Sequence, residues 1–406
     1  MPRRSARRGD LPRSDLPPIM QHPASHIFEH TPESLGEWCK ERRMPAFRAK
    51  QILEWVYQHG IADPGAMSNL SKLDRDTLAR DMTFLSGDIL RHDIASDGTQ
   101  KLLVQWQDFA NTATPAANSA STPLQVLNTN DTSRQTECVM IPSLPKDDED
   151  PDAEPAGPQR FTACISSQVG CPVGCRFCAS GLTGLDANLS AGRIVEQVWR
   201  LGRLEGVRRI TNVVFMGMGE PLANLNAVVP AIRTLTSLWA TGISARKITV
   251  STVGLPKAIE RLATLLDLPV TLALSLHAPT DDVRRKLIPW AEYTTIADLL
   301  QACQKWFEKT GREITLEYTL LRGVNDLPEH AEELARLAKT LRANVNLIRY
   351  NEVAGMPFAR PENQRVLEFQ RLLRARHVNA HIRASRGRDI AAACGQLRHE
   401  NAAKAG

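Results

Sequence analysis

The sequence predicts an α/β fold, a partial (β/α)6 barrel with a small helical module in front of it. Three observations predict this fold. From Phe161 onward, short apolar runs alternate with amphipathic helical stretches, the pattern of a parallel sheet. Six such strand–helix units follow one another, fewer than the eight of a complete barrel. Ahead of them, residues 31–82 carry apolar side chains at helical spacing.

The N-terminal module is expected to form helices over residues 29–85. Thr31 or Ser34 offers a helix N-cap, with acidic residues in the first turn. The stretch FRAKQILEWVYQHG has helical apolar spacing, with basic Arg48 and Lys50 alongside. A plain packing helix would explain this pattern, but the positive charge of the chain favours a small RNA-contacting module.

Residues 86–160 are expected to link the module to the barrel through paired strands. Residues 86–106 alternate in strand fashion around an Asp97-Gly98 turn, which signals a hairpin. TECVMI, residues 136–141, returns to a strand pattern. Two polar segments beside it bury too little apolar surface to order themselves. These two predicted flexible insertions are residues 110–135 and 143–159.

The charge of the chain is unevenly distributed. The net charge is +5, yet residues 143–159 hold six acidic residues and one lysine, so the rest of the chain carries +10. Residues 1–28 form a basic tail that is expected to be disordered. A basic body favours an anionic partner, most often nucleic acid, although surface solubility would also explain it.

Composition excludes several classes of protein. The 406 residues, with 25 Pro and 24 Gly, fit neither a collagen-like nor a wholly disordered chain. No run of eighteen apolar residues predicts a membrane span, and the N-terminus lacks the apolar core of a secretory signal. We therefore expect a cytoplasmic protein that does not enter a membrane. In such a chain eight cysteines indicate metal binding or catalysis more than disulfides.

The strongest motif is GCPVGCRFCASG, directly after the first barrel strand. Cys171, Cys175 and Cys178 form a C-x3-C-x2-C pattern, and Phe177 precedes the last cysteine. Structural zinc normally takes four protein ligands, so zinc would need Cys164 or Cys394 as well. Three thiolates on a four-iron cluster leave one iron open. The spacing and the aromatic residue resemble the signature of the radical S-adenosylmethionine (SAM) superfamily, which implies a [4Fe-4S] cluster and SAM.

Further polar and glycine residues fall at the carboxyl ends of the predicted strands, where α/β barrels build their sites. Any one of them alone is more often a cap or loop residue. Together, beside a cluster, they indicate SAM contacts. They are Gly219 and Glu220 after the second strand, Ser251 at the third, Ser275, Leu276 and His277 at the fourth, and Asn351 after the sixth.

Longer motifs resemble the RlmN/Cfr family of radical SAM enzymes, which methylate an adenine of RNA. They are ACISSQVGCPVGCRFC, FMGMGEPLANLN, SLHAP, GVND, NLIRYN and RGRDIAAACGQL. The resemblance covers roughly residues 30–400 outside the two insertions. It implies that residues 161–400 form a radical SAM barrel ending in a segment with a catalytic cysteine.

The resemblance also implies a role for individual residues. Cys394, in AAACGQL, matches the cysteine that becomes S-methylated, and Cys164 matches its resolving partner. Glu137, in TECVMIP, matches the residue assigned as proton acceptor. The remaining cysteines, Cys39, Cys138 and Cys303, match no role and are expected to be structural. The cluster ligands and SAM contacts are those named above.

The family's chemistry explains why two cysteines outside the cluster are needed. Adenine C2 is an electron-poor carbon that cannot displace a methyl group from SAM. In the family, one SAM methylates the cysteine that Cys394 matches, and a second SAM is cleaved to a radical that activates this methyl group for addition to adenine. A base removes the ring proton. The Cys164 counterpart then attacks the Cys394 sulfur, releasing methyladenine and leaving a disulfide.

The resemblance implies adenine C2 in 23S ribosomal RNA, at the peptidyl transferase centre, and in the tRNA anticodon loop as targets. A flavodoxin-type electron donor and a monomer are expected. RGRDI and the basic N-terminal helix favour C2, whereas FCASG and NLIRYN favour the Cfr-like alternative, a C8 methyltransferase of 23S rRNA that confers antibiotic resistance. A non-catalytic iron–sulfur or zinc RNA-binding protein is a further alternative, but binding alone would need neither Cys164 nor Cys394.

Overall fold

The computed structural model describes residues 25–107, 134–143, 160–182 and 184–397. Nearly all of the predicted basic tail and of the two predicted insertions lies outside these described residues, so their predicted flexibility stays a prediction.

Within the described residues, one ten-stranded sheet forms the frame of the molecule, in the order β1-β2-β3-β4-β7-β8-β9-β10-β11-β12. The last seven of these strands run parallel to one another. They are β4 (Phe161–Cys164), β7 (Asn212–Phe215), β8 (Ile248–Thr252), β9 (Thr271–Ser275), β10 (Ile314–Leu320), β11 (Ala343–Arg349) and β12 (Ala380–Arg383).

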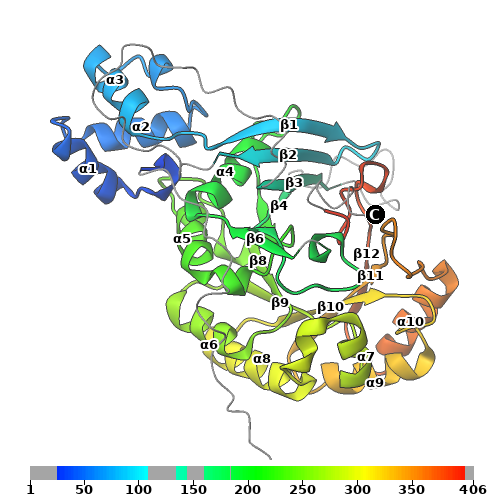
Figure 1. Cartoon of the computed structure of the whole chain (residues 1–406). Helices are drawn as coiled ribbons and strands as arrows, with labels where there is room; N and C mark the ends of the chain where they lie inside the picture. Colours follow the sequence, from blue (N-terminus) through cyan, green and yellow to red (C-terminus); the bar gives the residue numbers. More distant parts are fainter. Residues whose placement is uncertain (1–24, 108–133, 144–159, 183, 398–406) are drawn as a thin grey trace, which may run out of the picture.

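Helices connect successive parallel strands and cover the outer side of the curved sheet (Figure 1). They are α4 (Ala191–Leu201), α5 (Leu225–Thr236), α6 (Pro256–Leu265), α7 (Asp281–Leu287), α8 (Ile296–Thr310), α9 (Pro328–Ala338) and α10 (Asn363–Ala375). Six strand–helix units and a final strand result, which confirms the predicted partial barrel.

The sheet extends on its N-terminal side through three antiparallel strands: β1 (Gly87–Ile94), β2 (Gln100–Trp106) and β3 (Gln135–Pro142). Strand β3 pairs antiparallel with β4, so that Val139 lies opposite Cys164. The predicted hairpin and the strand after it are therefore confirmed. They form one continuous sheet with the barrel rather than a separate linker.

Alternation along each strand determines which side chains reach the interior of the barrel. In β10, Leu316 and Tyr318 pack into the apolar core under the helices. Glu317 and Thr319, between and after them, line the interior cavity instead. The same period of two puts Ser251 of β8 and Ser275 of β9 on the cavity side.

The N-terminal module consists of α1 (Pro32–Glu41), α2 (Arg48–Tyr57) and α3 (Lys72–Asp81). Thr31 caps α1 as expected: its hydroxyl accepts from Ser34 N, and the Ser34 hydroxyl accepts from Thr31 N. In Figure 1 the three helices lie together beyond the end of the sheet. The helical nature of this region is confirmed.

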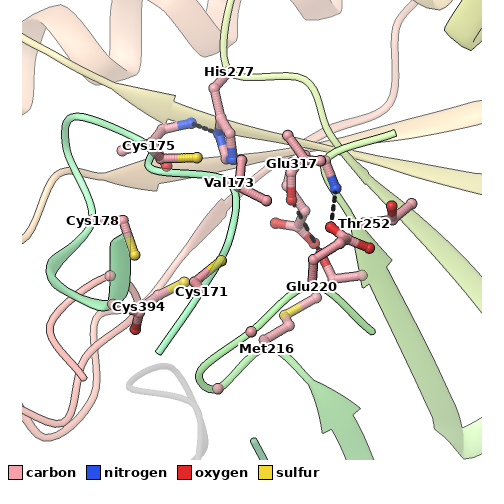
Figure 2. Close-up of a pocket in the computed structure, with 18 of the residues that line it drawn as sticks. Cys171, Val173, Cys175, Cys178, Met216, Glu220, Thr252, His277, Glu317 and Cys394 are labelled. Carbon is pink, nitrogen blue, oxygen red and sulfur yellow. Dashed lines mark hydrogen bonds between the residues drawn. The ribbon is translucent and has the colours of Figure 1, made fainter. Parts of the chain in front are cut away.

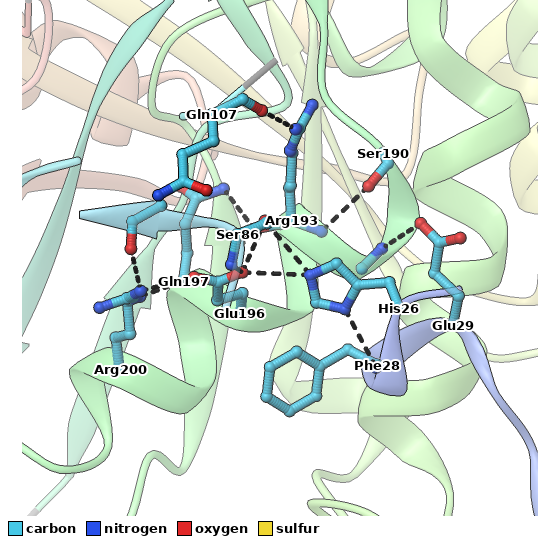
Figure 3. A network of polar contacts seen from close by, with 12 residues as sticks. His26, Phe28, Glu29, Ser86, Gln107, Ser190, Arg193, Glu196, Gln197 and Arg200 are labelled. Carbon is cyan, nitrogen blue, oxygen red and sulfur yellow. Dashed lines mark hydrogen bonds and ion pairs between the residues drawn. The ribbon is translucent and has the colours of Figure 1, made fainter. Parts of the chain in front are cut away.

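A buried polar network joins this module to the barrel (Figure 3). Glu196 of α4 lies at its centre: Oε2 is 3.2 Å from Nε2 of His26 and accepts from the Ser86 amide at 2.8 Å. Arg200, one turn later on α4, pairs with Oε1 at 2.7 Å. His26 and Glu196 are fully buried. These contacts attach the N-terminal module to α4, the first helix of the barrel.

The motif analysis missed a small second sheet beside the cysteine loop. Strands β5 (Gln168–Gly170) and β6 (Leu185–Asn188) pair antiparallel on either side of it. They are three and four residues long, too short for a periodic pattern to reveal. No helix of the described part of the chain is long and apolar enough to cross a membrane.

Candidate active site

The cysteine motif forms a loop between β5 and the 3-10 helix η5 (Ala179–Gly181). Gly170 enters the loop at φ +73°, and a Cβ there would lie 2.0 Å from the Gly184 carbonyl oxygen. The Arg176 amide donates to the Leu287 carbonyl, which holds the far side of the loop against α7. The loop is therefore fixed from two sides, with its cysteines facing the interior cavity (Figure 2).

Cys171, Cys175 and Cys178 all line this cavity. Burial raises the pKa of the Cys171 thiol to about 12 and that of the other two above its ordinary value. Three thiols fit a four-iron cluster, in which three irons take one thiolate each, whereas a structural zinc site normally takes four protein ligands. The three motif cysteines are therefore a suitable donor set for a cluster.

Gly217 and Gly219 bring the chain after β7 close to the loop that follows β4. A Cβ on Gly217 would lie 2.7 Å from the Ile165 carbonyl, and one on Gly219 would lie 2.7 Å from Cβ of Gln168. Gly219 also has φ +102°, which disfavours any side chain. This close approach delivers Glu220 to the cavity wall.

Glu220 is buried and its two carboxylate oxygens accept from different backbone amides, Leu222 N at 2.9 Å and Val253 N at 2.8 Å. Burial raises its pKa to about 7, against the opposing effect of these hydrogen bonds. A cation entering the cavity beside it would favour the charged carboxylate. The site thus offers a carboxyl group that a cation in the cavity would pair with.

His277 has a left-handed backbone, φ +55°, which is uncommon outside glycine. Its Nδ1 accepts from the Thr319 amide at 3.0 Å, and its carbonyl accepts from Asn325 Nδ2 at 2.8 Å. Burial lowers its pKa to about 3, so the ring is neutral and Nε2 carries the proton. The ring lies edge-on to Phe177, 5.0 Å between centroids, which links β9 to the cysteine loop.

Glu317 was not singled out from the sequence, yet it lies in the same cavity. Its Oε1 accepts from Asn346 Nδ2 at 3.1 Å, whereas its buried Oε2 has no hydrogen-bond partner in the structure. Burial raises its pKa. The signal in the sequence was a carboxylate in the middle of the apolar strand ITLEYTL.

The C-terminal segment brings Cys394 to the cluster loop. Cys394 lines the main cavity together with the three motif cysteines, and the Gly395 carbonyl accepts from Ala179 N at 2.8 Å. Cys394 also lines a smaller neighbouring cavity, whose wall includes Cys164. The two cysteines that the family resemblance pairs, 230 positions apart, therefore share one cavity.

Arg383, at the end of β12, lines this smaller cavity together with Arg386, and its Nη1 contacts the sulfur of Met216 at 3.2 Å. Burial raises the pKa of the Cys164 thiol to about 12. Cys394 is an exposed residue, yet desolvation by the chain around its sulfur raises its thiol pKa to about 11. Arg383 opposes this rise at both thiols. Nothing in the sequence distinguished Arg383 from the other arginines of the C-terminal stretch.

Two predicted SAM contacts lie outside the main cavity. Asn351 lines the smaller cavity, where its Nδ2 donates to the Cys394 carbonyl at 3.2 Å. The Leu276 side chain is fully buried in the apolar core. The structure thus gathers Gly219, Glu220, Ser251, Ser275 and His277 around the main cavity and leaves these two apart.

Glu137 does not line either cavity that contains Cys394. Its side chain, only 3% exposed, pairs with Lys101 Nζ at 2.8 Å. Arg91 lies 3.6 Å away on the exposed side. Lys101 in turn donates to the Ala391 carbonyl, three residues before Cys394. Glu137 is thus connected to the C-terminal segment through a lysine.

Comparisons with known proteins agree with this architecture. The Radical SAM superfamily model matches residues 165–341, and the "Ribosomal RNA large subunit methyltransferase N-terminal domain" model matches residues 26–83. A "Probable dual-specificity RNA methyltransferase RlmN" of Gloeobacter violaceus is 40% identical, covering 92% of this chain and 95% of the relative. The chain belongs to the RlmN family.

Other similar proteins extend the agreement with the RlmN family. A "Dual-specificity RNA methyltransferase RlmN" of Syntrophus aciditrophicus is 42% identical over 92% of this chain and 96% of its own length. The crystal structure of a radical SAM methyltransferase from Sphaerobacter thermophilus superposes with a TM-score of 0.80 at 39% identity, covering 92% and 99% of the two chains. RlmN proteins belong to the radical SAM superfamily, so a [4Fe-4S] cluster and SAM are the cofactors of this fold.

Proposed function

We propose that this RlmN-type radical SAM RNA methyltransferase methylates C2 of an adenine through an S-methylated Cys394 and a transient disulfide with Cys164. One observation carries the proposal: Cys394 lines the cavity of the three motif cysteines and also the cavity of Cys164. A cysteine that accepts a methyl group from SAM and later bonds to a second thiol must reach both places. A protein that only bound RNA would need neither contact.

The chain's own residues then have distinct tasks. Cys171, Cys175 and Cys178 would hold the cluster, and Glu220, Ser251, Ser275 and His277 would hold SAM. Gly219 lets the backbone approach, and Leu276 and Asn351, predicted as further SAM contacts, lie outside the lining of the main cavity. In each turnover, one bound SAM molecule would supply a methyl group, and a second would supply a radical. Cys394 carries the methyl group from the first to the RNA base.

Release of the product requires a base and a second thiolate. Glu137, which pairs with Lys101 outside the two cavities of Cys394, is the proposed acceptor of the ring proton of the methylene-bridged adduct. The Cys164 thiolate would then attack the sulfur of Cys394, so that the bond from this sulfur to the methylene carbon breaks as the disulfide forms. That carbon takes up a proton and becomes the methyl group of the product. Arg383 beside both sulfurs favours their thiolate forms.

We propose 23S rRNA and tRNA as substrates, with the three-helix module and the basic surface contacting their phosphates. We also propose a flavodoxin-type electron donor, a monomeric state and a cytoplasmic location. The proposed domains are residues 29–85, 86–160 and 161–400. The target adenine has to leave its stack to reach the cavity.

The test is nucleoside mass spectrometry of RNA incubated with the anaerobically reconstituted chain, SAM and a reductant. We expect 2-methyladenosine. The Cys394→Ala variant should lose all product and keep the cluster absorbance, whereas Cys303→Ala, a buried cysteine in α8, should keep both. 8-Methyladenosine would instead assign the Cfr-like reaction. Methylation by Cys394→Ala would overturn the cysteine mechanism.

A further inference from the structure

The turn of the β1–β2 hairpin lies against the segment that leads to Cys394. The Ser96 amide donates to Asp389 Oδ2 at 2.9 Å, and the Gly387 amide donates to Asp97 Oδ2 at 3.0 Å. The residues in contact are almost 300 positions apart in sequence. Two reciprocal backbone-to-carboxylate hydrogen bonds therefore join the hairpin turn to the C-terminal segment.

The fit at this contact is close. Gly387 has φ +62°, and a Cβ on it would lie 2.9 Å from Cγ2 of Thr99, which is fully buried. Ala391 also has a left-handed backbone, φ +51°, although it is not glycine. Such conformations cost free energy and persist where surrounding contacts fix them. The segment between Gly387 and Ala391 is thus shaped by the hairpin.

Lys101 of β2 adds a third attachment. Its side chain is 4% exposed, and its ammonium lies 2.8 Å from Glu137 Oε1 and donates to the Ala391 carbonyl at 3.4 Å. Asp93 lies 3.8 Å away. One buried cation therefore connects the carboxylate proposed as base to the backbone that carries Cys394.

On its other side, the segment is attached to the cluster loop. Ala179 N donates to the Gly395 carbonyl, and the Ser180 hydroxyl donates to the Leu397 carbonyl at 2.6 Å. Cys394 thus lies between two sets of attachments, one from the hairpin and one from the cluster loop. Its sulfur is held where the two cavities meet.

We propose that the β1–β2 hairpin is the positioning element of Cys394: Asp97, Asp389 and Lys101 hold the C-terminal segment so that this sulfur faces both the cofactor cavity and Cys164. The inference rests on the roles proposed above for the two cysteines. The physical basis is the effective concentration of the Cys394 thiol at Cys164. This concentration falls when the C-terminal segment loses hydrogen bonds and samples more conformations.

The test measures the equilibrium between the Cys164–Cys394 disulfide and glutathione in the cluster-loaded chain, by mass spectrometry of the linked peptides. Asp97→Asn keeps the size of the side chain but cannot accept from both Gly387 N and Thr99 N, because one carboxylate oxygen becomes a donor. We expect its equilibrium constant for disulfide formation to fall by about five- to tenfold, the effect of losing one charge-assisted hydrogen bond.

Asp389→Asn is the second variant. Because the Asp389 side chain is exposed, we expect this replacement to leave folding intact. Asp88→Asn is the matched control, since Asp88 lies on the same hairpin but accepts a hydrogen bond from Gln107 rather than from the C-terminal segment. The control should stay within twofold of wild type. In methylation assays the two variants should lower kcat and leave the KM for SAM unchanged.

A wild-type equilibrium constant in Asp97→Asn and Asp389→Asn would overturn the positioning proposal. Absence of the disulfide in the wild-type chain would instead contradict the proposed function. In that case the alkylation rate of Cys394 by iodoacetamide decides the positioning question by itself. A faster rate in both variants than in Asp88→Asn supports the proposal, and equal rates overturn it.

Discussion

At the scale of single residues, the main cavity contains a buried carboxyl group that makes no ion pair among the described residues. Glu220 is the clearest case, because it is buried, burial raises its pKa to about 7, and the groups that hydrogen-bond to its oxygens, the Leu222 and Val253 amides and the Thr252 side chain, are all uncharged. An ammonium beside this carboxylate would supply the missing positive charge. The burial of Glu220 therefore favours binding of a cation over an empty cavity.

We predict that Glu220→Gln lowers the affinity for SAM about tenfold, because a charge-assisted hydrogen bond becomes a neutral one. Equilibrium dialysis with the cluster-loaded chain measures it. Glu260→Gln, an exposed carboxylate paired with Lys305 on the outer helices, is the control and should change nothing. Equal affinity in both variants would show that Glu220 does not contact the ammonium.

Arg383 carries a second prediction at this scale. Replacing it by glutamine removes the cation that opposes the raised pKa of Cys394, so the thiolate fraction at neutral pH should fall. The rate of Cys394 alkylation at pH 8 should drop about threefold or more. Arg388→Gln removes the same charge from an exposed position nearby and should leave the rate unchanged. If the alkylation rate fell equally in both variants, the net charge of the region, and not Arg383 in particular, would set the reactivity of Cys394.

At the scale of elements, the site is positioned by two loops, after β4 and after β7, whose backbones lie in close contact. The chain after β7 crosses the loop after β4 so tightly that a Cβ on Gly217 would lie 2.7 Å from the Ile165 carbonyl carbon and oxygen. Gly217→Ala should therefore destabilise the fold by about 1–3 kcal/mol and weaken SAM binding. Gly36→Ala, in the middle of α1 with room for a methyl group, should be neutral or stabilise by roughly 0.5–1 kcal/mol. Urea unfolding of the two variants tests the difference.

The elements also show what sequence patterns can predict. β10 and α8 were predictable because their apolar residues repeat with the right period and Thr295 caps the helix. Helix α5 has a weaker helical pattern, since it is apolar on most sides and contains Pro230. The three motif cysteines follow from spacing, and the Cys164–Cys394 pair came from a family resemblance. No periodicity could show that Lys101, Glu137 and Ala391 meet, because strand pairing and a distant loop bring them together.

At the scale of the whole molecule, the buried network around Glu196 keeps the N-terminal module on the barrel. Trp199 Nε1 donates to the Val56 carbonyl, and Arg203 lies over the Trp199 ring at 3.7 Å, which adds contacts from the same helix. The module and the barrel therefore share α4 as a common support. Any RNA bound across both parts depends on this contact.

The pKa of Glu196 sets the pH dependence of this contact. Burial opposes ionisation, but hydrogen bonds and charge from His26, with Arg200 and Ser86, lower its pKa below the ordinary 4.5. A carboxylate with a lowered folded pKa stabilises the fold fully above its ordinary pKa, and this contribution is lost as the pH falls through the folded value. The contact is therefore complete at neutral pH.

Glu196→Gln should destabilise the chain by about 3 kcal/mol near neutral pH, because it leaves the buried Arg200 without its carboxylate. The difference from wild type should shrink in acid, where Glu196 itself becomes neutral and the two chains approach the same charge state. Urea unfolding followed by tryptophan fluorescence at about pH 7 and about pH 4 measures both values. Glu37→Gln, from an exposed pair with Lys40, is the matched control and should show little effect at either pH. A destabilisation of the same size at both pH values would mean that the Glu196 charge does not hold the module on the barrel.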